Sequence, residues 1–233
     1  MAVDLSPGLM SADEAITSRR SIRAFLPESV PQAMIEELLS VASRAPSGSN
    51  IQPWKVYVVQ GESKDKLVEA VTRVSASPEL VAQLKPAYTY YPKTWKPPFI
   101  DRRRKVGWGL YDLLGLTREN KEGMKAQHDK NYSFFGAPVG LIFTVDASLE
   151  QGSWLDYGMF IQSVMIAARA RGLDTCPQAA FVSYGEVIGE VLGFGAEEVL
   201  VCGMALGWAD PAAVENGLVT ERAPVEEFAK FLS

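Results

Sequence analysis

A basic cluster near the beginning of the chain is the first group of residues that could bind a charged ligand. Three guanidinium groups and one hydroxyl lie within five residues, in the order Arg19-Arg20-Ser21-Ile22-Arg23. Guanidinium groups pair with phosphate oxygens through two parallel hydrogen bonds, so the cluster could hold a phosphate. By composition alone, the same residues would also suit a solvated basic turn.

A second basic run, Arg102-Arg103-Arg104-Lys105, lies close to a group of aromatic residues. Basic and aromatic side chains together are typical of proteins that bind single-stranded nucleic acids. The chain as a whole is acidic, with 23 Lys and Arg against 28 Asp and Glu and a formal net charge of −5. This balance argues against nucleic acid as a partner. The second run could instead meet a cofactor phosphate, a substrate carboxylate or solvent.

A small polar loop is the next candidate for a binding element. Residues 45–54 read Ala-Pro-Ser-Gly-Ser-Asn-Ile-Gln-Pro-Trp. Hydroxyls, an amide and exposed backbone N–H groups in such a loop can bind a ring carbonyl or a phosphate. A plain loop at the end of a helix would have a similar composition.

Side chains that could act as metal ligands or nucleophiles are scarce. The 233 residues include one histidine, His128, and two cysteines, Cys176 and Cys202. One histidine cannot build a multi-histidine metal site, and two distant cysteines cannot hold a zinc ion or an iron–sulfur cluster. We therefore expect no metal, a surface position for His128 and buried, inert thiols.

The middle of the chain is rich in proline and aromatic residues. Five prolines interrupt the helical pattern from residue 78 to residue 98, and the aromatic residues there are Tyr88, Tyr90, Tyr91, Trp95 and Phe99. Long segments of this kind more often form lids or binding loops than linkers. No repeat or linker divides the sequence, so we expect one domain over residues 1–233 with a lid-like excursion at about 78–135.

Taken together, these segments resemble the nitroreductase family of FMN-dependent oxidoreductases. The resemblance rests on the order R-R-S-x-R, a helix, and then A-P-S-x-x-N-x-Q-P-W leading into a strand. It continues through residues 172–180 and 203–208, with Arg222 downstream, and the middle resembles the branch that includes nitrobenzoate and other nitroaromatic reductases. It implies an α+β (α/β sandwich) fold with a central, mostly antiparallel sheet flanked by helices, and an intertwined homodimer.

The resemblance also implies which residues bind FMN. The segment that holds the phosphate, the ribityl chain and the pyrimidine side matches Arg19, Arg20, Ser21 and Arg23. Arg222 matches a basic residue on the phosphate. Because the reduced flavin is anionic, a positive group near N1 and O2 such as Arg23 would stabilise it.

Two further segments match parts of the family's flavin site. The loop that reaches the flavin from the partner subunit matches Pro46, Ser47, Ser49 and Asn50. The loop that crosses the isoalloxazine near N5 matches Pro177, Gln178, Ala179 and Ala180. Many family members have Pro-Ile-Glu-Gly at these four positions, and this chain has different side chains there. The difference bears on substrate choice and reduction potential more than on flavin binding.

The implied activity is an FMN-dependent NAD(P)H oxidoreductase that works in a ping-pong cycle. The electron donor is NADH or NADPH, and the two-electron acceptor is a nitroaromatic compound, such as a nitrobenzoate, or a quinone-like compound. No catalytic side chain is expected, because the reaction takes place at flavin N5. Residues expected to stack on a small aromatic substrate are Tyr88, Trp95 and Phe134.

Rival interpretations remain open at this point. Within the same family, reductive dehalogenation or remodelling of the flavin itself would use a similar site. From other classes, a nucleic-acid-binding protein or a non-catalytic flavin carrier would also use basic and aromatic residues. The sequence does not choose among electron acceptors or between NADH and NADPH.

The elements that must position these residues alternate between helices and strands. Helices are expected at 11–19, 31–45, 63–74, 153–172 and 183–192, the first with capping-box spacing from Ser11 and the fourth with a left-handed cap at Gly172. Strands are expected at 55–60, 139–146 and 198–207.

Nothing in the sequence indicates secretion or a membrane span. Residues 1–5 lack the features of a signal peptide, and the longest apolar runs, near 139–145 and 199–206, are too short to cross a bilayer. Together with the low cysteine content, this predicts a cytoplasmic protein without a membrane partner.

Overall fold

A four-stranded antiparallel sheet forms the centre of the computed structural model, which describes residues 10–232. The strands lie in the order β1-β2-β4-β3, and their bounds are β1 Lys55–Gln60, β2 Val139–Asp146, β3 Asp174–Gln178 and β4 Glu198–Gly207. Every neighbouring pair is antiparallel. The predicted α+β fold with a mostly antiparallel sheet is confirmed.

The sequence predicts three of these strands and misses β3. Its five residues, Asp-Thr-Cys-Pro-Gln, show no apolar alternation and include Pro177. Proline is tolerated in a strand at the edge of a sheet, because its missing N–H then costs no ladder hydrogen bond. β3 lies at that edge, paired on one side with β4.

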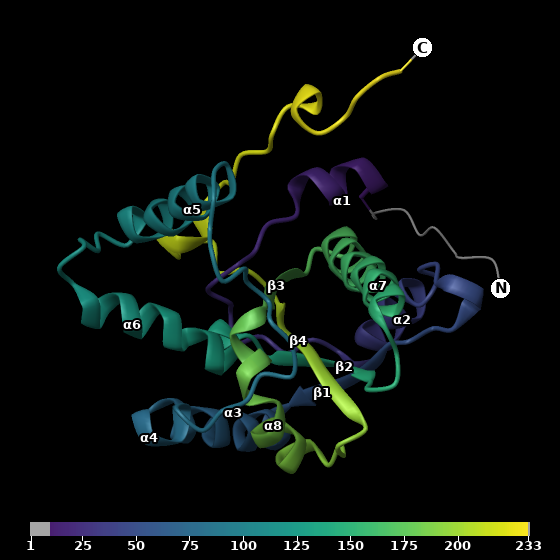
Figure 1. Ribbon diagram of the computed structural model, residues 1–233, viewed down its shortest axis with the longest axis horizontal. Helices are drawn as coiled ribbons and strands as arrows, with labels where there is room; N and C mark the ends of the chain where they lie inside the picture. Colours follow the sequence, from purple (N-terminus) through teal and green to yellow (C-terminus); the bar gives the residue numbers. More distant parts are fainter. Residues whose placement is uncertain (1–9, 233) are drawn as a thin grey trace.

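Helices cover both faces of the sheet (Figure 1). On one face α2 and α7 pack together, and α1 packs on α7; their bounds are α1 Ala12–Ser18, α2 Gln32–Ala42 and α7 Gln151–Ala170. On the other face lie α3 (Gly61–Ser75) and α8 (Gly185–Leu192). Two buried apolar clusters, one on each side of the sheet, hold these layers together.

The predicted helices are present with small differences at their ends. The capping box of α1 is formed, since Ser11 Oγ accepts from Glu14 N at 3.3 Å and Glu14 Oε2 accepts from Ser11 N at 2.9 Å. α3 begins two residues earlier than predicted, and Ser63 occupies its third position, where its hydroxyl accepts from Gln60 N at 3.1 Å. The left-handed cap at Gly172 is confirmed, with φ +78° after α7.

The middle of the chain contains more helix than its sequence predicts. Its elements are α4 Pro78–Val81, α5 Phe99–Leu113, α6 Lys121–Asp129 and the 3₁₀ segment η2 Lys130–Gly136. In Figure 1 α5 and α6 lie together beside the sheet rather than on it. No residue of α5 is buried.

Short 3₁₀ turns complete the described part of the chain. They are η1 Gly48–Asn50, η3 Ala179–Tyr184, η4 Val214–Gly217 and η5 Val225–Glu227. After η4 the C-terminal tail, residues 218–232, runs past α5 and away from the sheet (Figure 1). No helix within residues 10–232 is both long and apolar enough to cross a membrane.

Candidate functional site

The basic segment predicted to bind a phosphate lies along the outer edge of β3. Ser21 forms an isolated parallel bridge with Thr175, and Ile22 N donates to Thr175 O at 3.0 Å. Further along, Phe25 pairs in antiparallel fashion with Ala209. Two segments that are far apart in the sequence, residues 19–23 and β3, are therefore brought side by side.

Arginines gather beside this edge without a carboxylate partner. Burial and the nearby Arg222 guanidinium lower the pKa of Arg19. Arg23 Nη1 donates to Ser21 O at 3.1 Å, and Arg222 Nη1 donates to Thr220 Oγ1 at 2.8 Å, so both meet neutral acceptors. Within residues 10–232, none of these three arginines forms an ion pair. Arg19 and Arg23 are partly buried and Arg222 is exposed. Like charges gathered without a counter-ion favour a bound anion, so the residues fit a phosphate group.

Arg20 points to a different side of the segment. With Ser18 and Ile22 it lines a cavity of about 600 Å³, whereas its neighbours in the sequence, residues 19, 21 and 23, do not. Extended backbone sends alternate side chains to opposite sides, which explains the separation. Asp174 lines the same cavity, and burial raises its pKa, although the positive charges of Arg169 and Arg20 act to lower it. The structure thus places Arg20 apart from the other arginines of its cluster.

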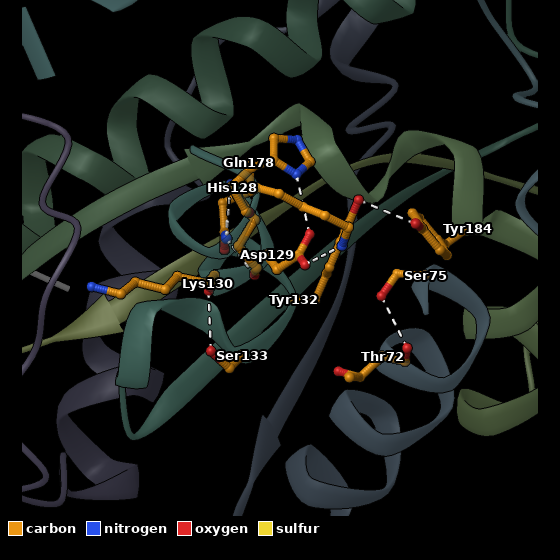
Figure 2. Close-up of polar contacts among 11 residues, drawn as sticks. Thr72, Ser75, His128, Asp129, Lys130, Tyr132, Ser133, Gln178 and Tyr184 are labelled. Atoms are coloured by element: carbon orange, nitrogen blue, oxygen red, sulfur yellow. Dashed lines mark hydrogen bonds and ion pairs between the residues drawn. The ribbon is translucent and has the colours of Figure 1, made fainter. Parts of the chain in front are cut away.

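The four residues predicted to face flavin N5 lie at the end of β3. Pro177 and Gln178 close the strand, and Ala179 and Ala180 begin η3. The Gln178 side chain is 2% exposed, and its Nε2 donates to Asn131 O at 2.7 Å and to Asn131 Oδ1 at 3.3 Å. Figure 2 shows Gln178 next to the segment that joins α6 to η2. Gln178 Oε1 is buried and has no hydrogen-bond partner among residues 10–232, so the hydrogen bonds of this side chain go to Asn131.

Two residues that orient other residues of this region were not predicted from the sequence. Asn131 orients Gln178, and Asn216 in η4 hydrogen-bonds the backbone of Arg23. Both act over long sequence separations, and a lone asparagine in a polar turn carries no local signal of such a contact. The turn chemistry of Glu215-Asn216-Gly217 predicts only that the chain bends there.

The polar loop at 45–54 is held against α7. Gly48 N donates to Asp156 Oδ2 at 3.0 Å, and Ser47 Oγ accepts from Gln52 N at 3.0 Å. Pro46, Ser49 and Asn50 are exposed. The backbone is left-handed at Ser49 (φ +49°), Asn50 (φ +58°) and Gln52 (φ +52°). Such conformations are strained for residues other than glycine and are often found at ligand-binding positions.

Two of the three predicted substrate residues lie on the aromatic segment of the middle region. Tyr88 OH donates to Val201 O at 2.6 Å, at a bulge where the register of β2 and β4 shifts. Its ring also packs edge-on against Trp154 at 4.6 Å. Trp95 lies beneath the Arg103 guanidinium, 4.9 Å from the ring centroid. Both residues are half-buried and hold the segment in place.

The third predicted substrate residue, Phe134, lies in the core. Its side chain is fully buried, and its ring stacks on Phe181 at 4.9 Å. A Cβ atom added at Gly140 would lie 2.6 Å from its ring, so the strand itself is shaped around Phe134. Because no face of the ring reaches a ligand surface, we do not retain Phe134 as a substrate residue.

The second basic run makes contacts within the chain. Arg102 pairs with Glu227 at 2.8 Å, and Lys105 pairs with Glu221 at 2.6 Å. These ion pairs join α5 to the tail on either side of Arg222, around a cavity of about 1000 Å³. The run is therefore largely engaged in holding the tail and, through Arg103, the aromatic segment.

The histidine and the cysteines occupy the expected kinds of position. The His128 side chain is 57% exposed, with Nδ1 at 3.7 Å from Asp129 Oδ1 (Figure 2). Both thiols are buried. Burial raises the pKa of Cys176 to about 11, although Arg23 and Arg19 nearby favour the thiolate, and burial raises the pKa of Cys202 to about 12.

We expect both thiols to resist modification in the folded protein. At pH 8 both thiols are protonated and shielded from solvent. An aromatic disulfide reagent should therefore release almost none of its aromatic thiolate when mixed with native protein, and two equivalents per chain after denaturation. Rapid reaction of one equivalent in the native protein would contradict the burial of Cys176 or Cys202. A Cys176→Ser variant identifies which thiol has reacted.

Known proteins match this chain over most of its length. The model of the Nitroreductase family matches residues 16–208. A chloronitrobenzene nitroreductase from Comamonas testosteroni is 39% identical over 94% of this chain and 96% of its own. A 4-nitrobenzoate reductase from Pseudomonas putida is 38% identical over 94% of this chain and 95% of its own.

A solved structure extends the similarity to three dimensions. The FMN and NADPH-dependent nitroreductase NfnB from Sphigopyxis sp. strain HMH matches with a TM-score of 0.92 and 37% identity. The match covers 96% of this chain and 100% of the other. The sheet order, the helical layers and the middle region described above are therefore shared with a protein of that description.

Proposed function

Because the chain belongs to the nitroreductase family, we propose that it is an FMN-dependent NAD(P)H nitroreductase that reduces nitroaromatic compounds. Supporting this, relatives of nearly equal length are a chloronitrobenzene nitroreductase and a 4-nitrobenzoate reductase. The observation that carries the proposal for this chain is the arginine group beside the outer edge of β3, which has no carboxylate partner among the described residues.

Each group of residues has a distinct task in the proposed site. Arg19 and Arg222 lie close enough to influence each other's charge and together hold the phosphate of FMN. Arg23 lies further along the same edge, toward the pyrimidine side of the ring. FMN, when bound, supplies two-electron hydride chemistry between a nicotinamide and a nitro group.

The end of β3 orients the cofactor ring. Pro177, Gln178, Ala179 and Ala180 pass beside its reactive edge, and the rigid β3 ladder with β4 fixes their backbone. Tyr88 and Trp95 are half-buried, and their contacts with Val201, Trp154 and Arg103 hold the aromatic segment in place. Arg20 lines its own cavity, and we assign it a supporting role through Asp174.

We further propose that two copies of the chain complete each flavin site in a cytoplasmic homodimer. The loop at 46–50 presents exposed polar groups on a strained backbone. In the described part of the chain, α7 is the one helix or strand to which this loop hydrogen-bonds, through Gly48 N and Asp156. On α7, Leu155 is 72% exposed and Met159 is 36% exposed, although the helix has little polar face. Light scattering is expected to give twice the chain mass of 25.5 kDa.

Turnover by the purified, FMN-loaded protein tests the proposed activity. The panel contains nitrobenzoates, chloronitrobenzene, a quinone and a halophenol, each assayed with NADH and with NADPH. We expect oxidation of the nicotinamide to depend on a nitroaromatic acceptor and hydroxylamine to accumulate.

Other outcomes would replace the proposal. Release of halide from the halophenol would identify a dehalogenase, and loss of the flavin itself would identify a flavin-remodelling enzyme. Bound FMN that neither nicotinamide reduces would identify a carrier. Absence of flavin binding together with salt-dependent binding to single strands would identify a nucleic-acid-binding protein.

A further inference from the structure

Asn216 is placed so that its side chain uses all of its hydrogen-bonding capacity on backbone atoms. Its Oδ1 accepts from Arg23 N at 2.8 Å and from Ala24 N at 3.2 Å. Its Nδ2 donates to Ala24 O at 2.8 Å and to Asp210 O at 2.9 Å. The residue is 8% exposed, so these four bonds are sheltered from water.

These bonds fill a gap in the backbone pairing of the basic segment. Ser21 is held by its bridge to Thr175, and Phe25 is held by its bridge to Ala209. Between the two bridges the N–H groups of Arg23 and Ala24 both point to Asn216 Oδ1. The backbone within residues 10–232 offers no acceptor to these two N–H groups, so the side chain of Asn216 supplies one.

A second contact fixes the turn that carries Asn216. The neighbouring residue Glu215 is buried, and its Oε1 lies 3.1 Å from Lys130 Nζ at the start of η2. The next residue of η2, Asn131, accepts two hydrogen bonds from Gln178. The turn at η4 is therefore tied to both sides of the proposed flavin site.

We propose that Asn216 is a positioning residue that sets the backbone of Arg23 and thereby directs its guanidinium to the flavin. This inference rests on the proposed function. Asn216 itself touches no cofactor, because all four of its polar bonds go to backbone atoms. Its loss should affect FMN binding and the electrochemistry of the bound flavin through the displacement of Arg23.

The test compares Asn216→Ala with a matched control, Asn120→Ala. Asn120 Oδ1 accepts from Gly123 N at 2.9 Å and caps α6, so its variant also loses an asparagine side chain that bonds to backbone, but away from β3. FMN affinity is measured by titrating apoprotein. The reduction potential of the bound flavin is measured by equilibration with a redox dye.

We expect Asn216→Ala to weaken FMN binding by about tenfold and to lower the flavin potential, because a cationic group has moved away from the reduced ring. Hydrogen exchange should accelerate at the amides of Arg23 and Ala24 while the amide of Ile22, bonded to Thr175, stays protected. Asn120→Ala should show the wild-type affinity and potential. A purely structural role for Asn216 would lower thermal stability and leave the flavin potential unchanged.

Wild-type affinity and potential in Asn216→Ala would overturn the inference. If that variant does not fold, Asn216→Ser provides the test, because its shorter side chain carries no amide oxygen for the N–H groups of Arg23 and Ala24 and adds no charge. Weaker FMN binding with altered potential supports the inference there too, and wild-type values again overturn it. Failure of the wild-type protein to bind FMN would instead refute the proposed function, on which the inference rests.

Discussion

Replacing Arg19 by alanine is expected to weaken FMN binding by about 10- to 100-fold, because the phosphate loses one of its charge-assisted hydrogen bonds. The apoprotein should not be destabilised to a similar extent. Burial and the nearby Arg222 lower the pKa of Arg19, so in the apoprotein the charged form of Arg19 destabilises the fold. Thermal unfolding with and without FMN measures both effects. The variant should lose most of the FMN-induced rise in melting temperature while its apoprotein melts at or above the wild-type temperature.

Arg104→Ala is the matched control for this prediction. Arg104 is exposed and makes no ion pair within residues 10–232. Its removal takes away the same formal charge, so a general electrostatic effect of the protein on a dianion would appear in both variants. Equal losses of FMN affinity in the two variants would contradict the assignment of Arg19 to the phosphate.

Replacing Phe134 by alanine is expected to lower the free energy of unfolding by about 3–5 kcal/mol. The reason is the cavity left among Phe181, Tyr132 and the backbone of Gly140, none of which can move freely within the strand and turn that hold them. Denaturant unfolding of the apoprotein measures this loss. Where the variant folds, its KM for a nitroaromatic compound should remain near the wild-type value.

Phe99→Ala provides the comparison, since Phe99 is 53% exposed and lies at the start of α5. It should change the free energy of unfolding by less than about 1 kcal/mol. A Phe134→Ala variant with nearly wild-type stability and a strongly raised KM would restore Phe134 as a substrate residue and refute its role in the core.

Local patterns in the sequence predict much of this fold because they follow from periodicity and capping. Ser11 with Glu14 marks the start of α1, and Gly172 marks the end of α7. The apolar strands β2 and β4 are continuous runs that need no tertiary information to identify. These features depend on residues within one turn or one strand of each other.

The elements and residues that were missed depend on contacts between distant parts of the chain. α5 carries no buried side chain, and the ion pairs Arg102–Glu227 and Lys105–Glu221 tie it to the distant tail. β3 becomes a strand through its pairing with β4, despite Pro177. Similarly, five consecutive residues at 19–23 form one motif in the sequence, and extended backbone divides their side chains between two sides.

The candidate site was predictable as a set of segments and less so as a set of side chains. Residues 19–23 run along the edge of β3, where Ser21 pairs with Thr175, and 177–180 follow at the end of that strand. Phe134 was misassigned because an aromatic residue near a proposed lid has the same composition as a core residue. Only the 4.9 Å stacking on Phe181 separates the two roles.

The position of the basic segment along β3 has a consequence for solubility. β3 is the outermost strand of the sheet, and an uncovered strand edge is a template for pairing with another chain. Ser21 and Ile22 occupy that edge opposite Thr175, so the same short segment proposed to bind the cofactor also shields the sheet from intermolecular strand addition. Conditions that release the segment would leave Pro177, which lacks an N–H, as the remaining barrier to aggregation through this edge.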